Sequence, residues 1–258
     1  MADFIRRTDV SGLTDPARIA ARIADAAEGG KAVVFSKSRF DPGELDLWIE
    51  VAEQFGRINR SAEDGGTGEV TQDCWIDVSF QPDKQHTFRH SRTAQPLHTD
   101  GAYLPDEQTV DRTFFLCQAT APSGGATRFF DSADLLDLVR QDDAGLADDL
   151  FDRPLSYGKL DRRGKTAPIL SEDPGGLSLN WNYFRVVAED GSAEARLRER
   201  FHLWLETRVV GGPACREINL APDEGAMFLD RRLLHGRAAF EAALPFDRAI
   251  WKCSVFDR

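Results

Sequence analysis

Apolar residues recur at helical spacing in four stretches of the chain. The first, residues 15–30, begins with an Asp-Pro pair that suits an N-cap and a first helical turn, and it ends with two glycines. Residues 41–56 repeat this arrangement, and residues 192–208 carry an apolar stripe. A shorter helix is expected from Ser132, as its cap, to Val139. Each helix should bury one face against the rest of the protein.

Short apolar runs separated by glycine, proline and charged residues predict strands. The central ones are rich in β-branched and aromatic residues. The expected strands cover residues 31–35, 69–74, 113–119, 127–130, 177–186, 227–229 and 248–256. Many short strands interrupted by helical segments indicate a mainly β fold, a double sheet with attached helices and a helical insertion.

The length and composition favour one domain over residues 1–258, because a chain with 41% hydrophobic residues can bury a large core. The four cysteines include no CxxC pair, so they predict neither a disulfide framework nor a zinc ribbon. The N-terminal residues lack the apolar stretch of a secretory signal, and no apolar run could span a bilayer. A cytoplasmic protein without membrane contact is expected.

The net charge of −11 argues against nucleic acid as a partner, since phosphate binding needs a concentrated basic surface. No prediction of the oligomeric state follows from the sequence.

The segment Pro96-Leu97-His98-Thr99-Asp100 offers two metal ligands. If the segment is extended, His98 and Asp100 point to the same side, because side chains alternate along a strand. An imidazole and a carboxylate suit a borderline or hard divalent metal. A third ligand must then come from elsewhere in the chain.

The ordered set His98-x-Asp100, His235-Gly-Arg and Arg248 resembles the iron(II)/2-oxoglutarate-dependent oxygenases. The similarity is to the taurine dioxygenase and clavaminate synthase (TauD/TfdA) branch, and it runs from about Gln95 to the C-terminus. The glycine-rich segment 124–129 is also similar to this branch. The resemblance implies a double-stranded β-helix, or jelly roll.

The same resemblance implies roles for individual residues. His98, Asp100 and His235 would bind Fe(II), Arg248 would hold the distal carboxylate of 2-oxoglutarate, and Thr127 would donate its hydroxyl to that co-substrate. Related halogenases replace the carboxylate ligand with a small residue, so Asp100 disfavours halogenation. The implied reaction uses O2 to hydroxylate a small polar metabolite, such as an amino acid derivative or a natural-product intermediate, and releases succinate and CO2.

Four further residues are candidates for substrate binding. Lys252 stands where taurine-cleaving members carry a second arginine, which makes taurine an unexpected substrate. Its ammonium group can bind an anionic group or reach solvent. Asn180 and Asn182 would share one face of the strand predicted at 177–186, and Gln95 lies three residues before His98.

Some features leave alternatives open. The polar segment 81–95 is either a lid over the site or an ordinary connection. Asp230 can orient His235 or occupy a turn, and Arg237 can form a structural salt bridge or contact the co-substrate. Two other functions remain possible at this stage: a catalytically silent jelly-roll module that binds a metal or a small acid, and a zinc hydrolase, which uses the same ligand types.

Overall fold

The computed structural model describes residues 3–37, 40–60, 71, 73–159 and 162–256. Its larger sheet has seven strands in the order β1-β2-β14-β6-β17-β3, with β4 beside β17. β1 and β2 are parallel, and the other pairs are antiparallel. The strands are β1 (Ile5–Asp9), β2 (Ala32–Ser36), β3 (Arg57–Ile58), β4 (Ile76–Ser79), β6 (Val110–Ala119), β14 (Glu224–Leu229) and β17 (Ala249–Phe256).

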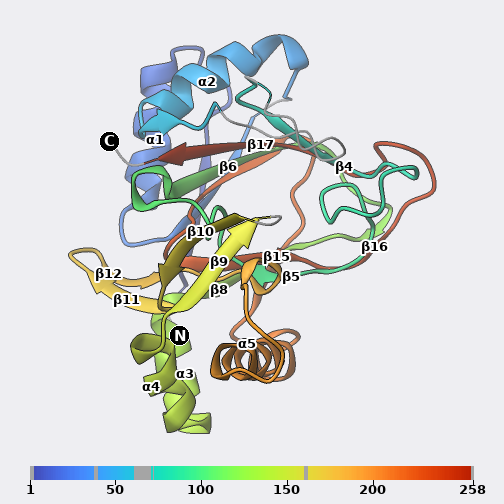
Figure 1. Cartoon of the computed structure of the whole chain (residues 1–258). Helices are drawn as coiled ribbons and strands as arrows, with labels where there is room; N and C mark the ends of the chain where they lie inside the picture. The colour runs from blue at the N-terminus through green and yellow to red at the C-terminus, as the bar shows by residue number, and fades with distance from the viewer. Residues whose placement is uncertain (1–2, 38–39, 61–70, 72, 160–161, 257–258) are drawn as a thin grey trace.

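A second, antiparallel sheet of four strands lies opposite the first and has the order β13-β8-β15-β5. Its strands are β5 (Gln95–His98), β8 (Thr127–Asp131), β13 (Arg216–Ile218) and β15 (Leu233–Arg237). In Figure 1 this sheet lies below the seven-stranded one. The mainly β architecture with two facing sheets agrees with the jelly roll expected from the sequence.

Helices cover the outer faces of both sheets. In Figure 1, α1 and α2 lie above the larger sheet, whereas α3, α4 and α5 lie below the smaller one. Their bounds are α1 (Pro16–Ala27), α2 (Leu45–Glu53), α3 (Ser132–Asp142), α4 (Ala144–Asp152) and α5 (Ala193–Trp204), and a π-helical turn, η4 (Leu205–Val209), continues α5.

Of the four predicted helix starts, two agree with the structure and two are shifted. Asp15 caps α1, as expected, and the helix predicted from residue 192 begins at Ala193 with Ser192 as its cap. The cap of α3 is Asp131 rather than Ser132, because the Asp131 carboxylate accepts the backbone N–H of Ala133. After Asp41, residues 42–44 form a 3₁₀ turn, η1 (Pro42–Glu44), so α2 begins three residues later than predicted.

The long strand β6 shows how alternation divides the core. Phe114 and Leu116 pack against α1 and α2, whereas Phe115 and Cys117 face the space between the sheets. On β17, Cys253 and Val255 also belong to the outer layer, and Ile250 lies between the sheets. Ile250 and Lys252 therefore face the smaller sheet.

The region 155–187 differs from the sequence prediction. The expected strand 177–186 ends early: β12 (Gly176–Leu179) pairs with β11 (Leu170–Asp173), and a 3₁₀ turn, η3 (Tyr183–Arg185), follows. A hairpin of β9 (Leu155–Lys159) and β10 (Arg162–Ala167) was not predicted. The strand expected at 69–74 lies largely outside the described residues, and Asp73 and Cys74 form no strand.

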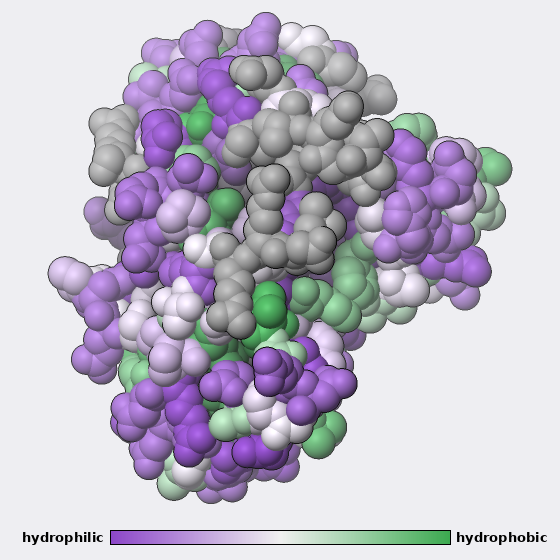
Figure 2. All heavy atoms as spheres, viewed as in Figure 1, coloured by the Kyte–Doolittle hydropathy of each residue, from purple (hydrophilic) through white to green (hydrophobic). Residues whose placement is uncertain are grey.

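The remaining elements are small. β7 (Ser123–Gly124) pairs with β16 (Phe240–Glu241), and η2 (Asp106–Gln108) precedes β6. Hydrophilic side chains dominate the face shown in Figure 2, and the apolar residues that reach it form separate small areas. Within the described part of the chain, every helix is too short or too polar to cross a bilayer.

Candidate active site

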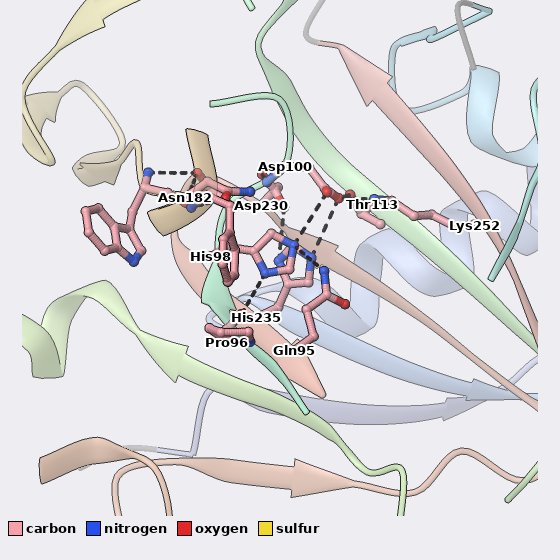
Figure 3. A network of polar contacts seen from close by, with 12 residues as sticks. Gln95, Pro96, His98, Asp100, Thr113, Asn182, Asp230, His235 and Lys252 are labelled. Atoms are coloured by element: carbon pink, nitrogen blue, oxygen red, sulfur yellow. Dashed lines mark hydrogen bonds and ion pairs between the residues drawn. The ribbon is translucent and has the colours of Figure 1, made fainter. Parts of the chain in front are cut away.

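His98, Asp100 and His235 converge between the two sheets (Figure 3). His98 ends β5 and pairs in register with His235 on β15, which places the imidazole centroids 4.3 Å apart. Asp100 lies in the turn after β5. Its carboxylate oxygens are 3.8 Å from His98 Nε2 and 3.6 Å from His235 Nε2. One ligand atom from each residue lies within 4.8 Å of the other two, so the three side chains can hold one metal ion.

The surroundings keep both imidazoles in the form that a metal needs. Burial lowers the pKa of His98 and lowers that of His235 well below its ordinary value. His98 Nδ1 is 2.9 Å from the carbonyl oxygen of Pro96, which only accepts hydrogen bonds, so Nδ1 carries the proton. His98 Nε2 therefore carries no proton and has a free electron pair. The Gln95 amide nitrogen donates a hydrogen bond of 3.2 Å to this Nε2.

Lys252 forms an ion pair with the carboxylate of Asp100. Burial raises the pKa of Asp100, but the charge of Lys252, followed by the two imidazoles, outweighs burial and leaves this pKa below its usual value. Asp100 therefore stays ionised. Thr113, on the inner face of β6, donates a longer hydrogen bond of 3.5 Å to the same carboxylate. Thr113 was not predicted as a site residue, and only the folded position of β6 shows that it shares the inner face with Phe115.

Asp230 lies behind the ligands and is fully buried. Its Oδ2 accepts the backbone N–H of Asp100 over 2.8 Å, and its Oδ1 is 3.2 Å from His235 Nδ1. Neither Oδ1 nor Nδ1 has another polar partner among the described residues. Burial, and then the charge of Asp100, raise the pKa of Asp230 well above its ordinary value. A cation bound at Asp100 would offset the effect of the Asp100 charge on the pKa of Asp230. Asp230 occupies the turn between β14 and β15, and its carboxylate lies beside His235, so the structure shows both predicted placements.

Arg248 lies just before β17 and is 6% exposed. Burial lowers its pKa to about 10, which still leaves it charged at neutral pH. Its Nε donates to the Gly125 carbonyl over 3.2 Å, and no carboxylate among the described residues pairs with its guanidinium group. The other residues that line the same small pocket are Cys117, Ala119, Thr120, Ala121, Gly125, Thr127, Asn219, Leu220 and Ile250.

Two features adapt this pocket to an anion. Gly125 has a φ of +76°, and a Cβ atom at this position would approach Arg248 Cδ to 3.2 Å, so a side chain there would crowd the arginine. Thr127 on β8 is buried and lines the same pocket. An uncompensated buried guanidinium with a neighbouring hydroxyl is suited to one end of a carboxylate ligand.

Asn180 and Asn182 do not share a strand face, because β12 ends before them. The Asn180 amide donates to the Ala102 carbonyl over 3.2 Å, and the Asn182 side chain accepts the backbone N–H of Phe184. Both side chains thus support loop structure beside the metal-binding turn. Contact of either residue with substrate remains a prediction, as does such contact for Gln95 and Lys252.

Arg237, two residues after His235, holds the segment that precedes the metal motif. Its Nη2 is 2.9 Å from each of three carbonyl oxygens, those of Phe88, Ser91 and Thr93. The side chain is 4% exposed, and burial followed by the charge of Arg248 lowers its pKa to about 9. No carboxylate pairs with Arg237 among the described residues, so the contacts replace the salt bridge considered above.

Replacing Arg237 with methionine should release the segment 88–93. A hydrogen bond to a charged group contributes about 1.5–3 kcal/mol to stability. In this variant the carbonyls of Phe88, Ser91 and Thr93 would each lose their hydrogen bond to Arg237. We expect trypsin to cleave after Arg89 and Arg92 at least about tenfold faster in Arg237→Met than in the parent protein. Arg237→Lys keeps the positive charge but loses the planar guanidinium group, so its cleavage rate should lie between that of the parent and that of Arg237→Met. Unchanged cleavage rates would show that Arg237 does not hold the segment.

The donor set fits iron(II). Two neutral imidazole nitrogens and one carboxylate on one side of an ion leave further positions for other ligands. The buried Arg248 guanidinium is suited to one carboxylate of a dicarboxylic acid. Ile250, which lines its pocket, and Lys252, which pairs with Asp100, lie two residues apart on β17. Zinc accepts the same ligand types, so the ligand set alone does not distinguish the two metals.

Comparison with known proteins supports this interpretation. A family model described as "Taurine catabolism dioxygenase TauD, TfdA family" matches residues 8–253. A uridine-5'-phosphate dioxygenase from an Amycolatopsis species is 28% identical over 177 residues, which correspond to 65% of this chain. The match spans 62% of that enzyme's own length.

Solved structures share the fold. An asparagine oxygenase, determined with Fe(II), 3-hydroxyasparagine and succinate, has a TM-score of 0.70 at 16% identity, and the match covers 93% of this chain and 78% of that one. A taurine dioxygenase from Burkholderia xenovorans also has a TM-score of 0.70, at 15% identity, and the match covers 100% of this chain and 89% of that one.

Proposed function

Because the chain belongs to the TauD/TfdA family of dioxygenases, we propose that it is an iron(II)- and 2-oxoglutarate-dependent oxygenase. The observation that carries this proposal is that the chain holds both a cluster of two histidines and one aspartate and a buried pocket around Arg248. Ile250, which lines that pocket, lies two residues from Lys252, the ion-pair partner of Asp100. When bound, iron and 2-oxoglutarate would supply the activation of O2, with release of succinate and CO2.

The proposed roles of the residues follow from their contacts. His98 and His235 would bind the metal through Nε2, and Asp100 would bind it through a carboxylate oxygen, so the contact of Gln95 with His98 Nε2 would be lost. Arg248 holds the distal carboxylate of 2-oxoglutarate, with Thr127 as a second donor. Asp230 orients His235 and fixes the backbone of Asp100.

For the substrate we propose a small polar metabolite that is hydroxylated. The names of the relatives support this class, since one acts on uridine 5'-phosphate and another is an asparagine oxygenase. Lys252, which lies between the sheets, supports a substrate with an anionic group. Uridine 5'-phosphate and asparagine are the first compounds for a substrate screen.

The proposal is tested by following 2-oxoglutarate in the presence of O2. The iron-loaded protein should convert 2-oxoglutarate to succinate slowly alone and faster with its substrate, with one succinate for each oxidised product. Protein loaded with zinc should be inactive. Turnover of a substrate by the zinc form without O2 would instead establish a hydrolase, and tight iron binding without any succinate would indicate a silent binding module.

Replacing Asp230 with alanine should weaken iron binding by roughly 10- to 100-fold, the usual effect of losing a residue that orients a metal ligand. Among the described residues, Asp230 is the one polar neighbour of His235 Nδ1, and its carboxylate accepts the backbone N–H of Asp100, so both contacts would be lost. Competition with a chromogenic chelator measures this change. Asp230→Asn keeps an acceptor for the Asp100 backbone N–H, so its iron affinity should lie between that of the parent and that of Asp230→Ala. An unchanged iron affinity in both variants would contradict the proposed role.

A further inference from the structure

The ring of Phe240 contacts two buried arginines. Its centroid is 5.0 Å from the guanidinium carbon of Arg237 and 5.5 Å from that of Arg248. All three residues are at most 6% exposed. The face of an aromatic ring attracts a guanidinium group, and this attraction is stronger where both groups are removed from water. Phe240 is therefore placed to hold the arginine that serves the co-substrate pocket.

Backbone hydrogen bonds and packing fix the position of Phe240. Its strand β16 pairs with β7, and the Gly125 N–H donates to the Ala239 carbonyl over 3.1 Å. The Phe240 N–H donates to the Arg92 carbonyl, also over 3.1 Å. The ring meets that of Phe80 edge to face, with centroids 6.2 Å apart. These contacts come from the protein itself, so the ring is in place before a ligand binds.

The two glycines at 124 and 125 allow Phe240 and Arg248 to lie this close together. A Cβ atom on Gly124 would lie 2.3 Å from the Ala239 carbonyl oxygen. One on Gly125 would lie 3.3 Å from Phe240 Cβ and 3.2 Å from Arg248 Cδ. A larger residue at either position would push the paired segments, or the ring and the arginine, apart.

Arg248 has few other restraints. Its Nε donates to the Gly125 carbonyl over 3.2 Å, and within the described ranges no other hydrogen bond fixes its side chain. A long side chain held by one hydrogen bond loses conformational freedom when a ligand binds, and this loss weakens binding unless packing has already ordered the side chain. The ring of Phe240 supplies such packing for the guanidinium group.

We propose that Phe240 is a positioning residue, whose ring holds the Arg248 guanidinium ready for the distal carboxylate of 2-oxoglutarate. It thereby strengthens the preference of the site for a dicarboxylic 2-oxo acid. The inference rests on the proposed oxygenase function and adds a residue to its co-substrate site. Phe240 is not among the residues that line the pocket, so it acts through Arg248.

The test compares two 2-oxo acids of equal chain length. The iron-loaded protein is titrated without O2 with 2-oxoglutarate and with 2-oxopentanoate, which has a methyl group in place of the distal carboxylate. The visible charge-transfer band gives a Kd for each. Only 2-oxoglutarate can use Arg248, so the Kd of 2-oxopentanoate divided by that of 2-oxoglutarate reports what this arginine contributes.

In Phe240→Leu, which keeps an apolar side chain without a ring, this ratio should fall about 3- to 10-fold. The fall should come from weaker binding of 2-oxoglutarate, while the Kd of 2-oxopentanoate and the affinity for iron stay at the parental values. Phe240→Met should behave in the same way, and it provides the measurement if Phe240→Leu does not fold. Phe240→Tyr keeps the aromatic face and should restore the parental ratio.

Phe80→Leu is the matched control. Phe80 belongs to the same apolar cluster and packs against Phe240, but no guanidinium group lies over its ring in the part of the chain that the structure describes. It should keep the parental ratio. An unchanged ratio without the Phe240 ring, an equal fall in Phe80→Leu, or a Phe240→Tyr that binds like Phe240→Leu would each overturn the inference.

A failure of this inference is distinguishable from a failure of the proposed function. If the parent protein forms the band with 2-oxoglutarate and the Phe240 variants keep the parental ratio, the role of Phe240 alone is rejected. If the folded, iron-loaded parent protein forms no band with 2-oxoglutarate, the oxygenase function itself is rejected.

Discussion

Replacing Asp100 with alanine should abolish turnover and weaken iron(II) binding by more than about 100-fold. Loss of a residue that only orients a ligand costs 10- to 100-fold, so loss of a ligand must cost more. The charge of Lys252, which pairs with Asp100 in the parent protein, would then repel the metal without compensation. Iron affinity by chelator competition and succinate formation measure the two effects.

Asp106→Ala is the matched control for this variant. Asp106 lies six residues further along, its side chain is 88% exposed, and it pairs with Lys165 rather than with the metal site. The control should keep iron affinity and activity, and both variants should keep the far-ultraviolet circular dichroism of the parent. Full activity of Asp100→Ala would show that the ligand assignment is wrong.

Replacing Arg248 with methionine should raise the KM for 2-oxoglutarate by roughly 30-fold to several thousandfold, while iron affinity stays within about threefold of the parent. Removing one partner of a buried charge pair costs about 2–5 kcal/mol. Arg248→Lys keeps the positive charge but loses the planar guanidinium group. Its KM for 2-oxoglutarate should therefore lie between that of the parent and that of Arg248→Met. An unchanged KM in Arg248→Met would show that 2-oxoglutarate is anchored elsewhere.

The same variant should not destabilise the protein without ligand. Arg248 is buried without a carboxylate partner among the described residues, and its charge contributes to the lowered pKa of Arg237. Methionine removes this repulsion and fills a similar volume. We expect the Tm of Arg248→Met to equal or exceed that of the parent in the absence of 2-oxoglutarate, and to gain less from adding it. A lower Tm without ligand would indicate that Arg248 has a structural role.

The parts of the fold that could be predicted from sequence are those with strong local signals. Asp15 and Ser192 cap helices through their own side chains, and β6 and β17 show clear apolar patterns. The β9–β10 hairpin was missed because its residues are largely polar, and its position depends on contact with Tyr103 rather than on its own sequence. The predicted strand extended past the end of β12 because the apolar residues of η3 continue the apolar pattern.

The metal-binding residues could be predicted because side chains two apart in an extended segment share a side, and because their order resembles a known family. Other partners could not be found in this way. The contact between Lys252 and Asp100 joins opposite sheets, and Thr113 reaches the same carboxylate from β6. Phe240 reaches Arg248 only through the pairing of β16 with β7, so no sequence spacing indicates this contact.

The most direct test of the central claim is an anaerobic titration of the metal-free protein with iron(II) and 2-oxoglutarate, monitored by visible absorption. Chelation of 2-oxoglutarate by iron at His98, Asp100 and His235 should produce the weak charge-transfer band of that complex. Asp100→Ala should lose the band, and Arg248→Met should require far more 2-oxoglutarate to form it. A folded parent protein that binds iron but forms no band would contradict the account, because 2-oxoglutarate could not then be its co-substrate.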